Sequence, residues 1–263
     1  MRSALRRFVG LGRWPPGGIV LLYHRVATLE TDPHRLAVTP AHFAEHLEVI
    51  NELGVPMSVE SMVERAPRGE VPPGAVAMTF DDGYADNLHC AAPLLARARV
   101  PATIFISTGA SESGGEFWWD ERDRGRTPGA TPLDPRPTHL PLGRDEIAVL
   151  AQQEGITIGS HTHSHPSLSS LPVDAQRREI ATARRLLESS VGSPVTSFAY
   201  PFGGSRDVSD CTRQIVRDEG ITIACTTRPD SVREDVDPLR VPRLVVRDWS
   251  KAEFLERWRS WTR

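Results

Sequence analysis

Strand-like apolar runs and amphipathic helix patterns alternate along most of the chain, and this alternation restricts the fold more than any other feature. Residues 18–24 form one apolar run that ends at a histidine, which is typical of a strand covered on both faces. Phe43, Leu47 and Ile50 then recur at the spacing of one helix face, and Gly54 ends the pattern. We predict strands at 18–24, 75–80, 101–107, 156–160, 197–200, 221–226 and 243–246, and helices at 39–54, 88–98, 143–154, 173–190, 206–219 and from 250 onwards.

Strands that alternate with helices form βα units, and such units build a mostly parallel sheet. The predicted strands suit a closed or nearly closed barrel, so we predict an α/β fold of the (β/α)7 barrel type. An open, doubly wound sheet is the alternative. The length of 263 residues fits one large domain, and no internal repeat or linker divides the chain. We therefore assign residues 1–17 to an N-terminal extension and residues 18–263 to a single domain.

Charge and hydropathy exclude two classes of partner. The formal net charge is −3, so no excess of positive charge is available to bind a nucleic acid. No apolar run reaches the roughly 20 residues that a transmembrane helix needs. The apolar part of the basic N-terminus, residues 8–12, is too short for the core of a signal peptide. We expect a cytoplasmic protein, with peripheral attachment to a membrane through the basic N-terminus as the alternative.

Polar residues follow three of the predicted strands directly. Asp81 and Asp82 come after the second strand and His161 after the fourth, while Tyr200 and Pro201 mark the end of the fifth. The carboxyl ends of parallel strands lie on one face of an α/β protein, where active sites are built. We therefore expect these clusters to converge in space.

The converging residues are suited to hold a metal ion. His161 and His165 are four residues apart, which suits one face of a helical turn. A turn at Gly83 would let both preceding carboxylates reach one pocket, although an acidic pair at this place could also cap the next helix. Two imidazoles and the carboxylate of Asp82 form a three-ligand site with room for water. We expect a divalent metal, Zn²⁺ first, with Co²⁺, Ni²⁺ or Mn²⁺ as alternatives.

Hydrolytic chemistry follows from this ligand set. A bound Zn²⁺ lowers the pKa of its water to about 7 and polarises a substrate carbonyl. Asp81, beside the metal and not bound to it, is the candidate general base. The tetrahedral oxyanion that forms needs a hydrogen-bond donor. Pro201 has no N–H group, so the backbone N–H of Phe202 is the best candidate.

The motifs at these positions resemble those of the polysaccharide deacetylase family, the NodB-homology enzymes of carbohydrate esterase family 4. Residues 79–83, TFDDG, match its first motif, and residues 161–165 match its H-[ST]-x-x-H motif. Residues 197–203 are similar to its third motif, and residues 21–26 to its opening strand. The resemblance implies a distorted (β/α)7 barrel, metal ligation by Asp82, His161 and His165, Asp81 as base and the Phe202 amide in the oxyanion hole.

Two positions depart from the family pattern. Ala199 stands where many members have an arginine that orients the catalytic aspartate, and residues 239–244 lack the histidine that usually acts as general acid. Arg243 is a candidate for the missing orienting charge. Either His24 or a protonated Asp81 is a candidate to supply the proton that the leaving amine needs.

Residues 109–142 are expected to form a long loop, rich in Gly, Pro, Asp, Arg and Thr, at the active-site face. Trp118 and Trp119 in this loop are suited either to stack on sugar rings or to bury against the barrel rim, and we expect one in each role. We assign both to substrate binding, together with Tyr200 and Arg243.

These residues predict a metal-dependent hydrolase that removes N-acetyl groups from amino-sugar glycans or saccharide precursors. Removal of a formyl group from nitrogen, or of an O-linked acetyl group, is a second hydrolase reading. An inactive, metal-holding carbohydrate-binding module is a third reading, motivated by the two departures. The retained Asp81 argues against the module, because binding alone does not need a free carboxylate beside the metal. In each reading the expected partner is an acylated carbohydrate.

Overall fold

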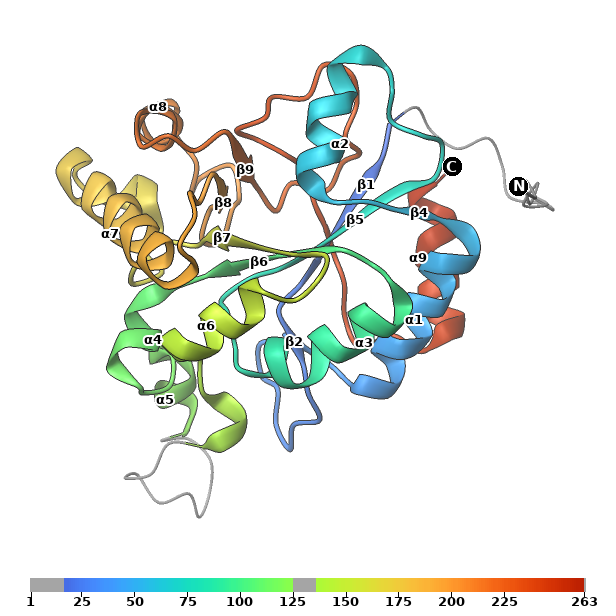
Figure 1. Cartoon of the computed structure of the whole chain (residues 1–263), viewed down its shortest axis with the longest axis horizontal. Helices are drawn as coiled ribbons and strands as arrows, with labels where there is room; N and C mark the ends of the chain where they lie inside the picture. Colours follow the sequence, from blue (N-terminus) through green and yellow to red (C-terminus); the bar gives the residue numbers. More distant parts are fainter. Residues whose placement is uncertain (1–16, 125–135, 263) are drawn as a thin grey trace.

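The computed structural model describes residues 17–124 and 136–262 of the protein (Figure 1). Its centre is an eight-stranded sheet in which every pair of neighbouring strands is parallel. Seven strands follow one another in the order β10-β1-β5-β6-β7-β8-β9, and a short strand, β4, pairs with the start of β5. The strands are β1 Ile19–Tyr23, β4 Val55–Pro56, β5 Ala75–Phe80, β6 Ala102–Ile106, β7 Ile156–Ser160, β8 Ser197–Ala199, β9 Ile223–Cys225 and β10 Leu244–Val245.

The sheet curls into a distorted barrel, which confirms the predicted fold class. From β1 to β9 the strand order follows the chain without the reversal that marks a doubly wound sheet, so that alternative is wrong. The last strand in sequence, β10, returns to pair with β1. Between the two ends of the sheet, Val241 forms a parallel bridge with Cys225 of β9, three residues before β10 begins. Residues 241–245 therefore link β9 to β1.

Helices cover the outside of the curled sheet (Figure 1). In α1 the side chains of Phe43, Leu47 and Ile50 are buried, as their spacing predicts. α1 packs against α3 and α9, and α7 packs against α6 and α8. All six predicted helices are present, as α1 Pro40–Leu53, α3 Ala92–Ala98, α6 Arg144–Ala151, α7 Val173–Val191, α8 Asp210–Asp218 and α9 Lys251–Trp261.

One helix that the sequence did not predict, α2 (Val59–Arg65), covers the end of the barrel where the strands begin. Its apolar residues join the cluster that fills the barrel interior, which includes Val20, Ala77 and Phe105. The carboxylate of Glu60 accepts hydrogen bonds from Ser197 Oγ at 2.8 Å and Thr103 Oγ1 at 3.2 Å. The amino-terminal end of the barrel is thus closed, and a ligand must enter from the opposite end.

The segment 109–142 differs from the predicted long loop. It contains α4 (Thr108–Ser113), α5 (Trp118–Arg124) and a 3₁₀ turn at Pro137–His139, while residues 125–135 lie outside the described residues. α5 begins at the first of the two tryptophans, so their backbone is helical. A second addition is the two-stranded parallel pair of β2 (Arg25–Val26) and β3 (Ala37–Val38), which places residues 32–36 beside the barrel mouth.

Apart from Gly17, the predicted N-terminal extension lies outside the described residues, as does the basic segment considered for membrane attachment. Among the residues that the structure does describe, no helix is both long enough and apolar enough to cross a bilayer.

Candidate metal centre and active site

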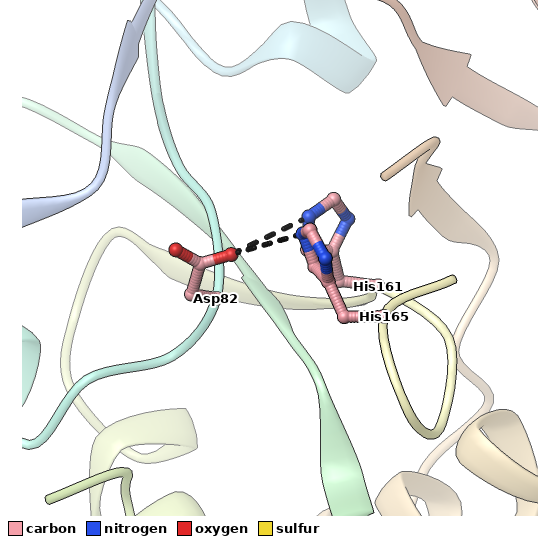
Figure 2. Close-up of side chains that lie close together, drawn as sticks. All are labelled: Asp82, His161 and His165. Carbon is pink, nitrogen blue, oxygen red and sulfur yellow. Dashed lines mark ion pairs between the residues drawn. The ribbon is translucent and has the colours of Figure 1, made fainter. Parts of the chain in front are cut away.

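The predicted metal ligands meet at the carboxyl ends of two barrel strands (Figure 2). Asp82 follows β5, whereas His161 and His165 follow β7. Asp82 Oδ1 lies 3.6 Å from His161 Nε2 and 3.4 Å from His165 Nε2. One ligand atom from each residue lies within 4.8 Å of the others. The three side chains face a common point that one ion can occupy.

Two turns, neither of them helical, bring these side chains together. The backbone of Asp82 has φ = 75° and that of Gly83 has φ = 85°, so the turn begins at the ligand itself, one residue earlier than predicted. Thr162 and His165 also have positive φ values, of 67° and 57°. The expected helical turn through the two histidines is therefore wrong. Positive φ is unfavourable for residues other than glycine, and such strain persists where the surrounding structure holds it in place.

The two imidazoles are oriented by different means. His161 Nδ1 lies 2.7 Å from the carbonyl oxygen of Ala199, and this hydrogen bond turns Nε2 toward Asp82. His165 Nδ1 is buried and has no hydrogen-bond partner among the described residues. Its ring packs between Trp119 and Phe202, with ring centroids 4.7 and 5.1 Å away. Aromatic contacts thus hold the second imidazole in place of a hydrogen bond.

The electrostatics of the three residues fit a divalent transition metal. Burial lowers the pKa of His161 and of His165, which keeps both imidazoles in the neutral form that binds metals. Burial, followed by the charge of Asp81, raises the pKa of Asp82 well above its usual value. A cation between the three groups would lower the pKa of Asp82, offsetting its burial and the charge of Asp81, and would further favour the neutral imidazoles. A buried set of one carboxylate and two imidazoles is a typical catalytic zinc donor set.

Asp81 lies beside the ligands and is held by Arg243. The guanidinium donates two hydrogen bonds of 2.7 Å, one to each carboxylate oxygen, and Arg243 Nη1 also donates to Thr79 Oγ1 at 3.2 Å. Burial raises the pKa of Asp81, but Arg243, His161 and His24 outweigh it and lower this pKa to about 2. The carboxylate is therefore ionised at neutral pH and fixed in orientation.

Arg243 is fully buried between the barrel core and Asp81, so the structure does not support a direct contact with substrate. Tyr200 is also a core residue in this structure. Only 1% of its surface is exposed, and its hydroxyl donates to the carbonyl oxygen of Leu239 at 3.1 Å. Strand β8 ends at Ala199, one residue earlier than predicted, and the next side chain turns toward α8 instead of the cavity.

A cavity of about 410 Å³ opens over the metal ligands and Asp81. Trp118 and Phe202 lie on its wall with about half of their surfaces exposed, at 51% and 52%. Trp119 also lines the cavity but is only 8% exposed, and its Nε1 donates to the hydroxyl of Tyr84 at 2.9 Å. One tryptophan is thus open to a ligand and the other is buried.

The remaining predicted residues lie in the same cavity. His24 is on its wall, and burial lowers the pKa of this imidazole to about 4. Phe202 has φ = 61°, and its backbone N–H has no acceptor among the described residues. This N–H is therefore free to donate to a ligand.

Several residues of the cavity wall were not predicted from the sequence. His34 and Leu36 belong to the segment that β2 and β3 bring to the barrel mouth, and no sequence pattern pointed to it. Arg247 lies just beyond β10. The rule that polar residues after strands converge on one face would have identified Arg247, had it been applied to the last strand.

The sequence model of the family named Polysaccharide deacetylase matches residues 68–224, more than half of the chain. The chain belongs to this family. YxkH of Bacillus subtilis (strain 168), which is named for the same family, is 25% identical over 231 residues, covering 86% of this chain and 70% of YxkH.

Solved structures show the same fold. The Streptococcus pyogenes deacetylase PplD, in complex with acetate, superposes with a TM-score of 0.73 at 22% identity, covering 90% of this chain and 96% of PplD. IcaB from Ammonifex degensii gives a TM-score of 0.72 at 22% identity, with 94% and 97% of the two chains covered. The distorted barrel is thus common to this polysaccharide deacetylase and these structures.

Proposed function

We propose that this polysaccharide deacetylase is a metal-dependent hydrolase that removes N-acetyl groups from amino-sugar glycans or from saccharide precursors. One observation carries the proposal. Asp82, His161 and His165 form a three-ligand set, while Asp81, in the same cavity and 3.9 Å from His161 Nε2, has both carboxylate oxygens hydrogen-bonded to Arg243. A site that only bound a metal would have no use for a buried, ionised carboxylate beside its ligands.

Asp82, His161 and His165 would hold the ion, which we expect to be Zn²⁺, with Co²⁺, Ni²⁺ or Mn²⁺ as alternatives. Such an ion supplies Lewis-acid polarisation of the acyl carbonyl and lowers the pKa of water. Asp81 takes the proton of the attacking water, and its two hydrogen bonds from Arg243 keep the carboxylate in one orientation. The arginine that many family members carry at the position of Ala199 is thus replaced by one from the other end of the sheet.

The oxyanion and the leaving amine need two further groups. We assign the hydrogen bond to the oxyanion to the backbone N–H of Phe202, which lines the cavity and has no acceptor among the described residues. His24 stands on the same cavity wall as Asp81, and we assign it the transfer of a proton to the leaving nitrogen. Since His24 is neutral in the free cavity, the proton that it passes on must be the one that Asp81 takes from the attacking water. Return of the proton by Asp81 itself is the alternative.

The open wall of the cavity is suited to a carbohydrate. Trp118 and Phe202 expose aromatic faces, which pack well on the apolar face of a sugar ring. The acetate bound to PplD is the product expected of this chemistry and supports acetyl as the group removed.

The direct test is acetate release from N-acetylglucosamine oligomers in the presence of Zn²⁺ or Co²⁺. We expect turnover by the wild type, no metal-dependent turnover by Asp82→Asn, and a loss of at least about 10²-fold in kcat for Asp81→Asn, as is usual when a general base is removed. Arg240→Gln, an exposed arginine outside the cavity, is the control for substitution itself. Metal binding without turnover on N-acetylated, N-formylated or O-acetylated sugars would favour the binding module instead.

A further inference from the structure

Arg247 is a positively charged residue on the wall of the cavity over the metal ligands, and the proposed reaction gives it no role. It follows β10 and lines the cavity together with His24 and Val245. Among the described residues, no carboxylate lies within ion-pair distance of its guanidinium, and its one hydrogen bond goes from Nη1 to the carbonyl oxygen of Arg35. The N–H groups on Nε and Nη2 are therefore left without an acceptor in the described part of the protein.

The acids near Arg247 are committed to other partners. Both oxygens of Asp32 accept backbone N–H groups, from Leu36 and Ala37, at 2.9 Å each. On the cavity wall, Asp81 is paired with Arg243, and Asp82 faces the two histidine ligands. The guanidinium of Arg35 has no ion-pair partner among the described residues. Burial lowers the pKa of Arg247, and the like charge of Arg35 lowers it further.

With a divalent ion in the site, the charges in the cavity would add up to an excess of positive charge. Asp81 and Arg243 neutralise each other, and the ion would exceed the single charge of Asp82 by one. The uncompensated Arg247 adds another positive charge. A cavity lined by one sign of charge attracts ligands of the opposite sign.

We infer that Arg247 forms an anion-binding subsite, and that the N-acetylated saccharide acted on by this protein carries a carboxylate or phosphate group. This inference rests on the proposed function for the identity of the saccharide. A guanidinium is planar, always charged, and binds carboxylate and phosphate oxygens through two parallel hydrogen bonds. Anchoring of Nη1 by the Arg35 carbonyl reduces the side-chain entropy that binding would otherwise remove.

The test compares three substrates at equal ionic strength: a neutral N-acetylglucosamine tetramer, N-acetylglucosamine 1-phosphate, and a disaccharide containing N-acetylmuramic acid, which supplies a carboxylate. We expect the wild type to have a higher kcat/KM for one of the two anionic substrates than for the neutral one. In Arg247→Gln, kcat/KM for the anionic substrate relative to that for the neutral substrate should fall roughly ten- to hundredfold. This is the range expected for the loss of hydrogen bonds to charged groups. The anionic substrate whose kcat/KM falls more shows whether the bound group is a phosphate or a carboxylate.

Arg247→Lys keeps the positive charge, so it should retain part of the preference for the anionic substrate. The control variant Arg240→Gln changes an exposed arginine outside the cavity and should retain all of that preference. Equal losses on neutral and anionic substrates in Arg247→Gln would overturn the subsite and indicate a role in the chemistry or in the loop at Arg35. Absence of any preference in the wild type would overturn it as well.

Calorimetric binding of N-acetylglucosamine 1-phosphate to the Zn²⁺-loaded protein separates this inference from the proposed function. Weaker binding by Arg247→Gln than by wild type, in a protein that releases no acetate, would support the subsite and contradict the hydrolase. Equal binding by the two proteins would contradict the subsite even if acetate is released.

Discussion

At the scale of single residues, the pair of Asp81 and Arg243 decides whether this protein can act as a base catalyst. A buried carboxylate without a partner would be protonated, because burial disfavours its charged form. The two hydrogen bonds of 2.7 Å from Arg243 reverse this effect and lower the pKa of Asp81 to about 2. The sequence lacks the family's arginine at Ala199 and offers Arg243 as a candidate replacement, and the structure places that guanidinium on Asp81.

Removal of this arginine should shift the pH dependence of the reaction. In Arg243→Met the pKa of Asp81 rises, since burial then acts without compensation, so the acid limb of kcat/KM moves to higher pH. The free energy of unfolding should fall by about 3–5 kcal/mol, as it does when one partner of a buried ion pair is removed. Arg243→Lys keeps the positive charge, so its acid limb of kcat/KM should move less than that of Arg243→Met. An unchanged acid limb in both variants would show that Asp81 is not the base.

The assignment of His24 is tested by its removal. His24→Ala should lower kcat by about 10²-fold or more if this imidazole passes the proton to the leaving amine. The expected loss is greatest for substrates with a poor leaving group, which depend most on protonation. If kcat is intact across the pH range, the proton returns from Asp81 instead.

At the scale of elements, α5 connects the outer loop to the metal site. Tyr84, two residues after Asp82, donates to the carboxylate of Asp120 at 2.6 Å and accepts from Trp119 Nε1 at 2.9 Å. Trp119 in turn packs on His165, whose Nδ1 has no hydrogen-bond partner among the described residues. The position of α5 therefore supports one metal ligand through packing.

The substitution Tyr84→Phe tests this role of α5. It removes a donor to a buried carboxylate and leaves a buried indole N–H without its acceptor, which should destabilise the protein by about 1–3 kcal/mol. We also expect Zn²⁺ affinity, measured by chelator competition, to fall roughly tenfold, as for other residues that orient metal ligands. Tyr200→Phe loses a comparable hydrogen bond to Leu239 away from the site and should leave the affinity unchanged. Equal affinities in the two variants would contradict the role of α5.

The elements also show how far the sequence predicts this structure. The core strands and six of the helices were predictable because their apolar spacing is regular. β4, consisting of Val55 and Pro56, was missed because two residues show no period. α2, of seven residues, was also missed, whereas the equally short α3 continues the helical segment Asn87–Ala91 and shares its pattern. The metal ligands were predictable from their positions after strands. The non-helical turn at Thr162 and His165 was not, because positive φ at those residues is set by tertiary contacts and not by local preference.

At the scale of the whole molecule, the metal site joins segments that are about 80 residues apart in the chain. Asp82 extends from β5 and the two histidines from β7, with β6 between them in the sheet. These ligands are assembled only in the folded barrel, so an ion that binds them stabilises the native state over the unfolded chain.

Metal addition should therefore raise the melting temperature. At a Zn²⁺ concentration 100 times the Kd, the native state gains about 2.7 kcal/mol. For a chain of this size that gain corresponds to a shift of roughly 5–10 °C. Differential scanning calorimetry with and without EDTA measures the shift, and Asp82→Asn should remove most of it. A shift of equal size in Asp82→Asn would place the bound ion elsewhere.

Anomalous scattering from a Co²⁺-loaded crystal at the cobalt edge is the most direct test of the metal centre on which these proposals depend. We predict one peak bonded to Asp82 Oδ1, His161 Nε2 and His165 Nε2, with both oxygens of Asp81 still on Arg243. A peak coordinated by Asp81, or no peak between these three side chains, would contradict the assignment of ligands and base.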